Sequence, residues 1–239
     1  MANSIPGKFK KFWGLRSRWQ RRALGVVGFL VAWPLVMTII YGVVPVPISN
    51  LMILRLFTGN GIHKTWVSLD QISPQLEKAV VSSEDQRFCE HHGVDWVEFH
   101  EATGNGTPRR GASTISMQTA KNMFLWDGHS YVRKGIEIPL AYYMDAVWTK
   151  RRMMEVYLNI VEWAPGVYGA EAASQYHFKK PASQLTRREA AFLAAVLPNP
   201  IKRNAGKPNG KVRSVANRIM LRMVSMDAYV TCLAQNPRL

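Results

Sequence analysis

The fold is decided by two segments, VVSSEDQRFCEHHGVDW at residues 80–96 and RRGASTISMQ at residues 109–118. The first carries Glu84 and Asp85, and the second is a run of small and hydroxyl side chains. A second glutamate, Glu137, follows in the segment RKGIE, beside two cations. Two carboxylates framed by hydroxyls and cations indicate glycosyl chemistry, because such a site needs a base for a sugar hydroxyl and cations for a departing group.

Helical patterns surround these segments. Residues 74–84 carry Leu76, Ala79 and Val80 at the spacing of an amphipathic helix that ends near Glu84. Residues 102–112 are a Gly-rich loop that we expect to move, and residues 51–70 are expected to be irregular. Period-2 strand patterns are nearly absent, so the chain is predicted to be mainly α. Further helices are predicted at residues 113–124, 131–148, 150–159 and 166–178, with a kink or break at Pro139 in the second of these. Two more helices follow: one opens with a capping box of Thr186 and Glu189, and the last ends at about Leu233.

Residues 23–44 are 22 consecutive uncharged residues, ALGVVGFLVAWPLVMTIIYGVV. At about 1.5 Å per residue they can cross a hydrocarbon core of about 30 Å, which predicts a transmembrane helix. Pro34 is expected to kink it. A buried core helix and a cleaved signal peptide are the alternatives, but a signal sequence usually has a shorter apolar region, and no A-x-A site follows.

The charge distribution separates two classes of partner. The 239 residues carry a formal charge of +15, and residues 1–44 hold seven cations and no acid, which leaves +8 for the rest. A pI near 10 often signals nucleic acid, but a basic head directly before an apolar run indicates a bilayer and no nucleic-acid partner. The positive-inside rule predicts a cytoplasmic N-terminus and, in a bacterium, a periplasmic domain after residue 44.

The chain has two cysteines, Cys89 and Cys232. An oxidising compartment permits a disulfide between them, but a separation of 143 positions says nothing about their distance in space. The expectation is two buried, unpaired thiols. Their spacing to the histidines does not fit a four-ligand zinc site.

Five segments together resemble a known family. EDQRFCEHHGVDW, GASTISMQ, RKGIE, KRRMMEVYLN and EAAFLAAVLPNP occur in the order and approximate spacing of the signature segments of glycosyltransferase family 51, the peptidoglycan glycosyltransferases. The resemblance covers about residues 70–200 and is strongest to the family's monofunctional, membrane-anchored members. The transpeptidase marks Ser-x-x-Lys and Lys-Thr-Gly are not found, so the resemblance implies a chain that polymerises glycan without crosslinking it.

The resemblance implies a lysozyme-like helical domain that joins lipid II units with inversion, forms β-1,4-linked glycan and releases undecaprenyl pyrophosphate. Glu84 matches the family's general base, and Glu137 matches its second carboxylate. A structural pairing of Glu137 with Arg133, four residues earlier, is the alternative. Positions that match donor-sugar and phosphate contacts are Ser113, Thr114, Gln118, Lys121, Arg133 and Lys134, although Ser113 and Thr114 also suit helix capping.

Other features of these motifs are expected to be structural. His91 is predicted to order the catalytic loop by hydrogen bonding, and Asp85 to orient a neighbour or a backbone amide. Glu155 and Asn159 are predicted to serve helix packing. Two departures from the family are Met117, where a glutamine is usual, and His129, where an arginine is frequent, and both predict weaker or pH-sensitive activity.

The sequence therefore predicts four regions: a basic cytoplasmic segment at 1–22, a transmembrane helix at 23–44, a linker and membrane-proximal segment at 45–69, and a periplasmic glycosyltransferase domain at 70–239. The expected partners are lipid II, the growing glycan strand, the bacterial inner membrane, and other cell-wall synthesis or division proteins. No organic cofactor is expected; a divalent cation, Mg or Mn, held by Glu84 or Glu137 is one option. The alternative functions are a catalytically weak membrane scaffold and a lysozyme-like glycan hydrolase.

Overall fold

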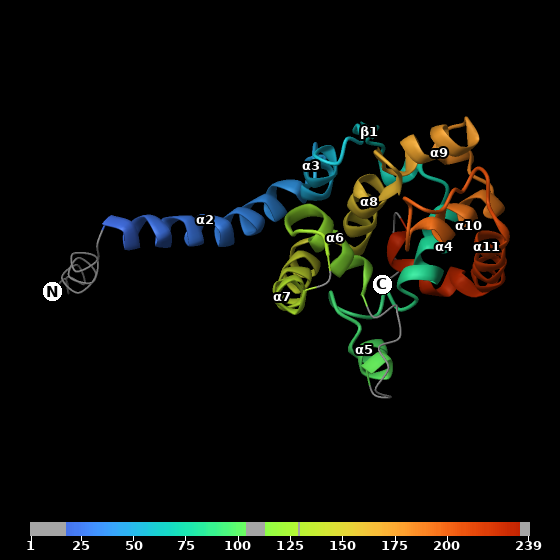
Figure 1. Cartoon of the computed structure of the whole chain (residues 1–239). Helices are drawn as coiled ribbons and strands as arrows, with labels where there is room; N and C mark the ends of the chain where they lie inside the picture. The colour runs from blue at the N-terminus through green and yellow to red at the C-terminus, as the bar shows by residue number, and fades with distance from the viewer. Residues whose placement is uncertain (1–17, 104–112, 129, 235–239) are drawn as a thin grey trace. The chain divides into compact units, whose positions relative to one another are not determined.

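The computed structural model describes residues 18–103, 113–128 and 130–234 (Figure 1). Most of the predicted Gly-rich loop, residues 104–112, lies outside the described residues, as does His129. The described helices are α2 (Arg18–Tyr41), α3 (Asn50–Leu56), α4 (Pro74–Glu84), α5 (Trp96–Thr103), α6 (Ile115–Phe124), α7 (Tyr131–Val147), α8 (Lys150–Ile160), α9 (Ala170–Phe178), α10 (Arg187–Val196) and α11 (Gly210–Arg222). The predicted mainly α class is confirmed.

Helix α2 is long enough and apolar enough to cross a membrane by length and composition. It starts at Arg18 and ends at Tyr41, so it begins and ends earlier than the predicted span at 23–44. Thr38 is its one buried residue. The helix continues through Pro34, whose carbonyl accepts a hydrogen bond from the Thr38 hydroxyl at 2.7 Å. This helix is consistent with a single-pass membrane anchor.

The domain after residue 42 is organised around α8, whose apolar residues are buried on nearly every side. Met153, Val156 and Leu158 have no exposed surface, and α8 packs against α6 and α7. On the other side of the domain α4 packs against α10, and α10 against α11. The N-terminus of α10 carries the predicted capping box of Thr186 and Glu189. This packing holds the C-terminal end of α4 close to the start of α6.

A small sheet was not predicted. Its order is β1-β3-β2, with β1 (His63–Lys64) parallel and β2 (Glu162–Ala164) antiparallel to β3 (Val167–Tyr168). The helix predicted at 166–178 therefore starts only at Ala170. Strands of two or three residues are too short to show a period-2 pattern, which explains why the sequence did not reveal them.

Two further expectations were wrong, and of the kink or break predicted at Pro139 the break is not found. Residues 50–56, expected to be irregular, form α3, because Ser49 caps its N-terminus and Asn50 Nδ2 donates to the Leu125 carbonyl at 2.7 Å. Pro139 does not split α7, since losing one backbone donor leaves the rest of the helical ladder in place. The last α-helix ends at Arg222, and two 3₁₀ segments follow, Met223–Tyr229 and Thr231–Leu233.

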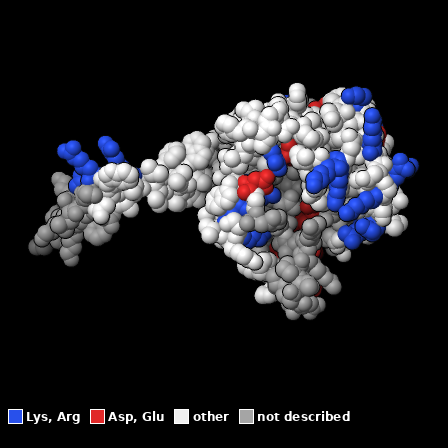
Figure 2. All heavy atoms as spheres, in the orientation of Figure 1, with Lys and Arg blue, Asp and Glu red and all other residues white. Residues whose placement is uncertain are grey.

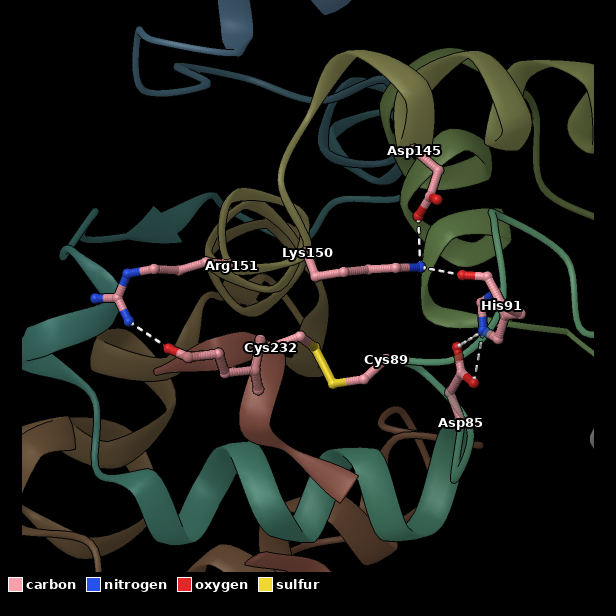
Figure 3. The surroundings of a disulfide bond; sticks show 8 residues. Asp85, Cys89, His91, Asp145, Lys150, Arg151 and Cys232 are labelled. Carbon is pink, nitrogen blue, oxygen red and sulfur yellow. Dashed lines mark hydrogen bonds and ion pairs between the residues drawn. A yellow bond between two sulfur atoms is a disulfide. The ribbon is translucent and has the colours of Figure 1, made fainter. Parts of the chain in front are cut away.

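The two cysteines form a disulfide, which corrects the expectation of free thiols. Cys89 and Cys232 have Cα atoms 5.7 Å apart although 143 positions separate them in sequence (Figure 3). The last 3₁₀ turn reaches this position because Arg151 donates to the Leu233 carbonyl at 2.6 Å. The disulfide therefore ties the C-terminal segment to the loop that follows Glu84.

We expect Cys89→Ser/Cys232→Ser to lower the free energy of unfolding by about 2–5 kcal/mol, because a crosslink across so long a loop restricts the unfolded chain. Thermal unfolding followed by circular dichroism in detergent would measure the change. Reducing the parent should reproduce it, and reductant should not affect the variant. An unchanged melting temperature would show that the crosslink has no stabilising role.

Candidate active site

Glu84 is the last residue of α4, and its carboxylate meets α6 and α8 through a chain of hydrogen bonds. Gln118 Nε2 donates to Glu84 Oε2 at 3.0 Å, and the Tyr157 hydroxyl donates to Gln118 Oε1 at 3.0 Å. Tyr157 is fully buried, and burial raises the pKa of its phenol well above the ordinary value, so it remains a donor. The chain Tyr157–Gln118–Glu84 fixes the orientation of one carboxylate oxygen.

The environment of Glu84 favours its neutral form. Burial raises the pKa of the Glu84 carboxyl above 4.5, and the nearby Asp85 charge raises it further. The hydrogen bond from Gln118 and the Lys121 ammonium act in the opposite direction and lower this pKa. A carboxylate whose pKa is raised, at a point that solvent still reaches, is a stronger base than an ordinary surface carboxylate.

Glu137 is buried on α7 and engaged by two cations. Arg133 is ion-paired to one of its oxygens, and Lys134 Nζ lies 3.1 Å from the other. Arg133 Nε also donates to the Gly128 carbonyl at 3.1 Å, and Lys134 Nζ donates to Ser113 Oγ at 2.7 Å. The predicted pairing of Glu137 with Arg133 is therefore present, and Lys134 is a second cation on the same carboxylate; the match of Glu137 to the family's second carboxylate stays a prediction.

A cavity of about 510 Å³ joins these groups. It has Tyr131 and Ser130 on its wall, and six predicted site residues line it: Ser113, Gln118, Lys121, Arg133, Lys134 and Glu137. Burial lowers the pKa of Lys121, while the Glu137 charge acts against this effect. Three cations thus face one cavity, with Glu84 hydrogen-bonded to the Gln118 side chain that lines it.

The loop after Glu84 is held by Asp85, as predicted. His91 Nε2 bonds to both Asp85 oxygens, at 2.9 and 3.0 Å, and Asp85 Oδ2 accepts from the Ile115 amide at 2.9 Å. Asp85 and His91 are both buried, and Figure 3 shows the His91 ring facing the Asp85 carboxylate. The carboxylate therefore connects the end of α4 to the start of α6, and the predicted ordering role of His91 is confirmed.

A second set of contacts supports the same loop. Lys150 Nζ donates to the His91 carbonyl and to Asp145 Oδ1, both at 2.6 Å (Figure 3). Gly93 has φ of +79°, and a Cβ there would lie 2.8 Å from the Ala141 carbonyl oxygen, so only glycine fits this approach to α7. These contacts fix the loop on its far side from Glu84.

Some predicted residues have structural surroundings. Thr114 is buried; its hydroxyl accepts from the Met117 amide at 3.1 Å and donates to the Gly93 carbonyl at 2.6 Å, which makes it the N-cap of α6. Met117 is fully buried, with its sulfur 3.8 Å from Lys134 Nζ. Asn159 bonds to the backbone of Val67 in both directions, which confirms its predicted packing role.

Glu155 also serves packing, as predicted, because its Oε2 accepts from the Leu69 amide at 3.0 Å. Sequence reasoning missed Tyr157 and Lys150 as parts of the site. The signal that could have found them is that both residues belong to the fourth signature segment, KRRMMEVYLN.

The donor set does not fit a divalent cation. Both oxygens of Glu137 face cationic nitrogens, and one oxygen of Glu84 accepts from Gln118. Among the described residues no group of three or more His, Cys, Asp or Glu side chains could hold a metal ion. The side chains as placed therefore provide cations and not metal ligands.

A larger cavity, of about 980 Å³, lies beside the disulfide and is not the candidate site. Its Asp70 and Arg151 side chains pair with each other at 2.7 Å, and Lys78 pairs with Asp227. Burial raises the pKa of Glu77 on its wall to about 7. Its charged groups are thus largely paired, whereas the smaller cavity combines several cations with an adjacent base.

Comparisons with known proteins agree with the geometry. The Transglycosylase family profile matches residues 51–224. A protein of Rhizobium leguminosarum bv. trifolii named "Biosynthetic peptidoglycan transglycosylase" is 49% identical over 229 residues, which cover 94% of this chain and 97% of the relative. Relatives with the same name from Agrobacterium fabrum and Brucella suis are 52% and 44% identical, over 78% and 92% of this chain and 84% and 99% of their own lengths.

We expect Glu84→Gln to raise the melting temperature at pH 8 by roughly 2–6 °C and to leave it unchanged near pH 4. Burial raises the folded-state pKa of Glu84 above its unfolded value, so the carboxyl is neutral in both states at low pH. As pH rises through the folded pKa, the buried charge destabilises the fold, and glutamine removes that cost.

Thermal unfolding from pH 4 to 8 would measure the difference. Glu77→Gln is a matched comparison on the same helix, and its gain should develop from the ordinary carboxyl pKa of 4.5 up to about pH 7. A Glu84→Gln protein that is less stable at every pH would show that the Gln118 bond to the ionised carboxylate outweighs the cost of burial.

Proposed function

The chain belongs to the transglycosylase family and is a peptidoglycan glycosyltransferase that polymerises glycan strands; from this premise we propose that it acts on lipid II with Glu84 as its general base. Its helical domain is the lysozyme-like transglycosylase domain. The observation that carries the proposal is the position of Glu84, which is hydrogen-bonded to Gln118 at the edge of a cavity that three cations line.

Glu84 takes the proton from the 4-hydroxyl of the acceptor GlcNAc. The hydroxyl oxygen then forms a bond to the anomeric carbon of the donor MurNAc, and the bond from that carbon to the pyrophosphate oxygen breaks. Attack opposite the leaving group inverts the anomeric centre and gives a β-1,4 linkage. The proton remains on Glu84 until it passes to water.

The electron pair leaves with undecaprenyl pyrophosphate, a stable anion that needs cations more than a proton. Lys121, Arg133 and Lys134 line the cavity and supply that charge, and Glu137 keeps two of them in position. Ser113 and Gln118 offer polar contacts to the donor, while Thr114 caps α6. Since the donor set does not fit a divalent ion, no step of this proposal uses one.

The geometry favours transfer over hydrolysis. A glycosidase needs a second carboxyl that donates a proton to the leaving sugar. Glu137 instead faces two cations, an arrangement that suits a carboxylate and not a proton donor. A neutral leaving sugar would also have no use for Lys121 or Arg133.

We place the domain in the periplasm of a bacterial inner-membrane protein with a cytoplasmic N-terminus. Seven cations before and at the start of α2 support this orientation. The disulfide supports it independently, because disulfides persist in oxidising compartments and are rare in the cytoplasm. Contacts with other cell-wall synthesis proteins remain a prediction.

We expect Glu84→Gln to lower the polymerisation rate at least ~100-fold, because general-base catalysis contributes about 10²–10⁴. Labelled lipid II and the detergent-solubilised full chain would measure it. The parental rate should rise with pH through the raised pKa of Glu84, since the base acts only when ionised. Glu77→Gln, a control on the same helix outside this cavity, should retain activity. Equal rates for the parent and Glu84→Gln would refute the assignment.

We expect Lys121→Met to weaken binding of farnesyl pyrophosphate, a short analogue of the leaving group, by about tenfold or more. The reason is the loss of one of the three cations in the cavity. Calorimetric titration would measure the dissociation constant. Lys78→Met removes a cation that pairs with Asp227 elsewhere and should bind as the parent does. Unchanged affinity in Lys121→Met would mean that this lysine does not contact the leaving group.

A further inference from the structure

The positive charge of the domain is concentrated in one stretch. Residues 179–222 contain eleven Lys and Arg and a single acid, Glu189, which gives +10. The remainder of residues 45–239 has a net charge of −2. The excess charge therefore comes from α10, α11 and the segments beside them, and Figure 2 shows Lys and Arg side chains gathered over that part of the molecule.

Six cations of this stretch are exposed and define what we call the basic face: Lys202, Lys207, Lys211, Arg213, Arg218 and Arg222. In the part of the chain that the structure describes, none of the six forms an ion pair with an acid. Several described cations elsewhere in the domain pair with carboxylates, as Arg55 does with Glu162 and Lys150 with Asp145. No acid among the described residues neutralises the charge of the basic face, although Arg213 and Arg222 donate to backbone carbonyls.

Three of these residues lie in one line along α11. Lys211, Arg218 and Arg222 are spaced by seven and four positions, which places them on one side of the helix over about 16 Å. The line ends near the catalytic base, because Arg222 NH1 lies 3.4 Å from the carbonyl of Ser82, two residues before Glu84. A surface pocket of about 410 Å³ lies at this end, with Gln86 and Tyr229 among its lining residues.

The basic face lies on other helices than the cavity lined by Lys121, Arg133 and Lys134. Lys121 and Arg133 lie on α6 and α7, which pack together, whereas α11 packs on α10 and α4 (Figure 1). In the donor, the sugar chain extends from the MurNAc ring on the side away from the pyrophosphate. With the pyrophosphate at Arg133, we infer that the growing strand passes Glu84 and extends toward α11, where Arg222 lies beside Ser82.

We propose that the basic face binds the growing glycan strand through the carboxylates of its stem peptides. The proposal rests on the proposed function, because the ligand is the product of that reaction. Uncrosslinked peptidoglycan carries free peptide carboxylates on successive disaccharides, so it is a regular polyanion. A line of unpaired cations that starts beside the catalytic base complements such a strand and keeps it on the enzyme between additions.

A lipid surface fits this face less well. The exposed apolar side chains Ile53, Leu56 and Phe57 lie on α3, and Tyr131 and Val132 lie on α7. Both helices pack against α6 and away from α11 (Figure 1). A bilayer that meets α3 and α7 would leave the basic face free for a polymer.

The test compares the full-length parent with a variant in which Lys202, Lys207, Lys211 and Arg218 are all changed to Gln. The control replaces each Lys by Arg, and the Arg by Lys, at the same four positions, so that the net charge is unchanged. The probe is a soluble, uncrosslinked glycan strand with intact stem peptides, and the same strand after the peptides are removed by an amidase.

We expect the Gln variant to bind the intact strand at least tenfold more weakly, with a smaller dependence on salt, and the charge-preserving control to bind as the parent does. The stripped strand should bind the parent as weakly as it binds the Gln variant. Glycan products of the Gln variant should be shorter, while the first coupling of two lipid II molecules proceeds at the parental rate.

Equal binding of the intact strand by the parent and the Gln variant would overturn the proposal. So would equal affinity of the parent for intact and stripped strands, or a loss confined to vesicles of anionic lipid. The first coupling separates this test from the proposed function: a parent that couples no lipid II refutes that function, whereas normal coupling with unchanged strand binding refutes only the role of the basic face.

Discussion

The Asp85 carboxylate is the contact on which the candidate site depends. It bonds to the His91 ring and accepts from the Ile115 amide at 2.9 Å, so a single buried group connects the end of α4 to the start of α6. Glu84 directly precedes it, and Gln118 and Lys121 follow on α6. Together with the Gln118–Glu84 hydrogen bond, this connection holds the base beside the residues that orient it.

The surrounding contacts make this connection rigid from three directions. Lys150 bonds to the His91 carbonyl from α8, the Thr114 hydroxyl bonds to the Gly93 carbonyl from the start of α6, and Cys89 is tied to Cys232. A loop that is buried, hydrogen-bonded and crosslinked holds its first residue in one position. General-base catalysis needs that precision, because the carboxylate must lie within hydrogen-bonding distance of the acceptor hydroxyl.

Charge is divided between two parts of the domain. Two of the cavity cations, Arg133 and Lys134, are held by Glu137, while six cations of α11 and the preceding segment are exposed to solvent. Paired cations stay in place and act at short range. Unpaired cations on the surface attract a flexible anionic polymer without fixing its position, and salt screens this attraction. The two arrangements suit a small leaving group and a long product.

The sequence by itself determined the mainly helical class, the apolar anchor, the end of α4 at Glu84, the capping box at Thr186 and most residues of the cavity, since periodicity, caps and motif residues are local signals. Only the tertiary structure decided that Cys89 meets Cys232, that α7 passes through Pro139 unbroken, and that Tyr157 orients Gln118 against Glu84. It also showed that Thr114 caps a helix and that α3 and a small sheet exist. These features depend on contacts between residues far apart in the chain, or on strands too short for a pattern, and local sequence contains no record of which distant groups will meet.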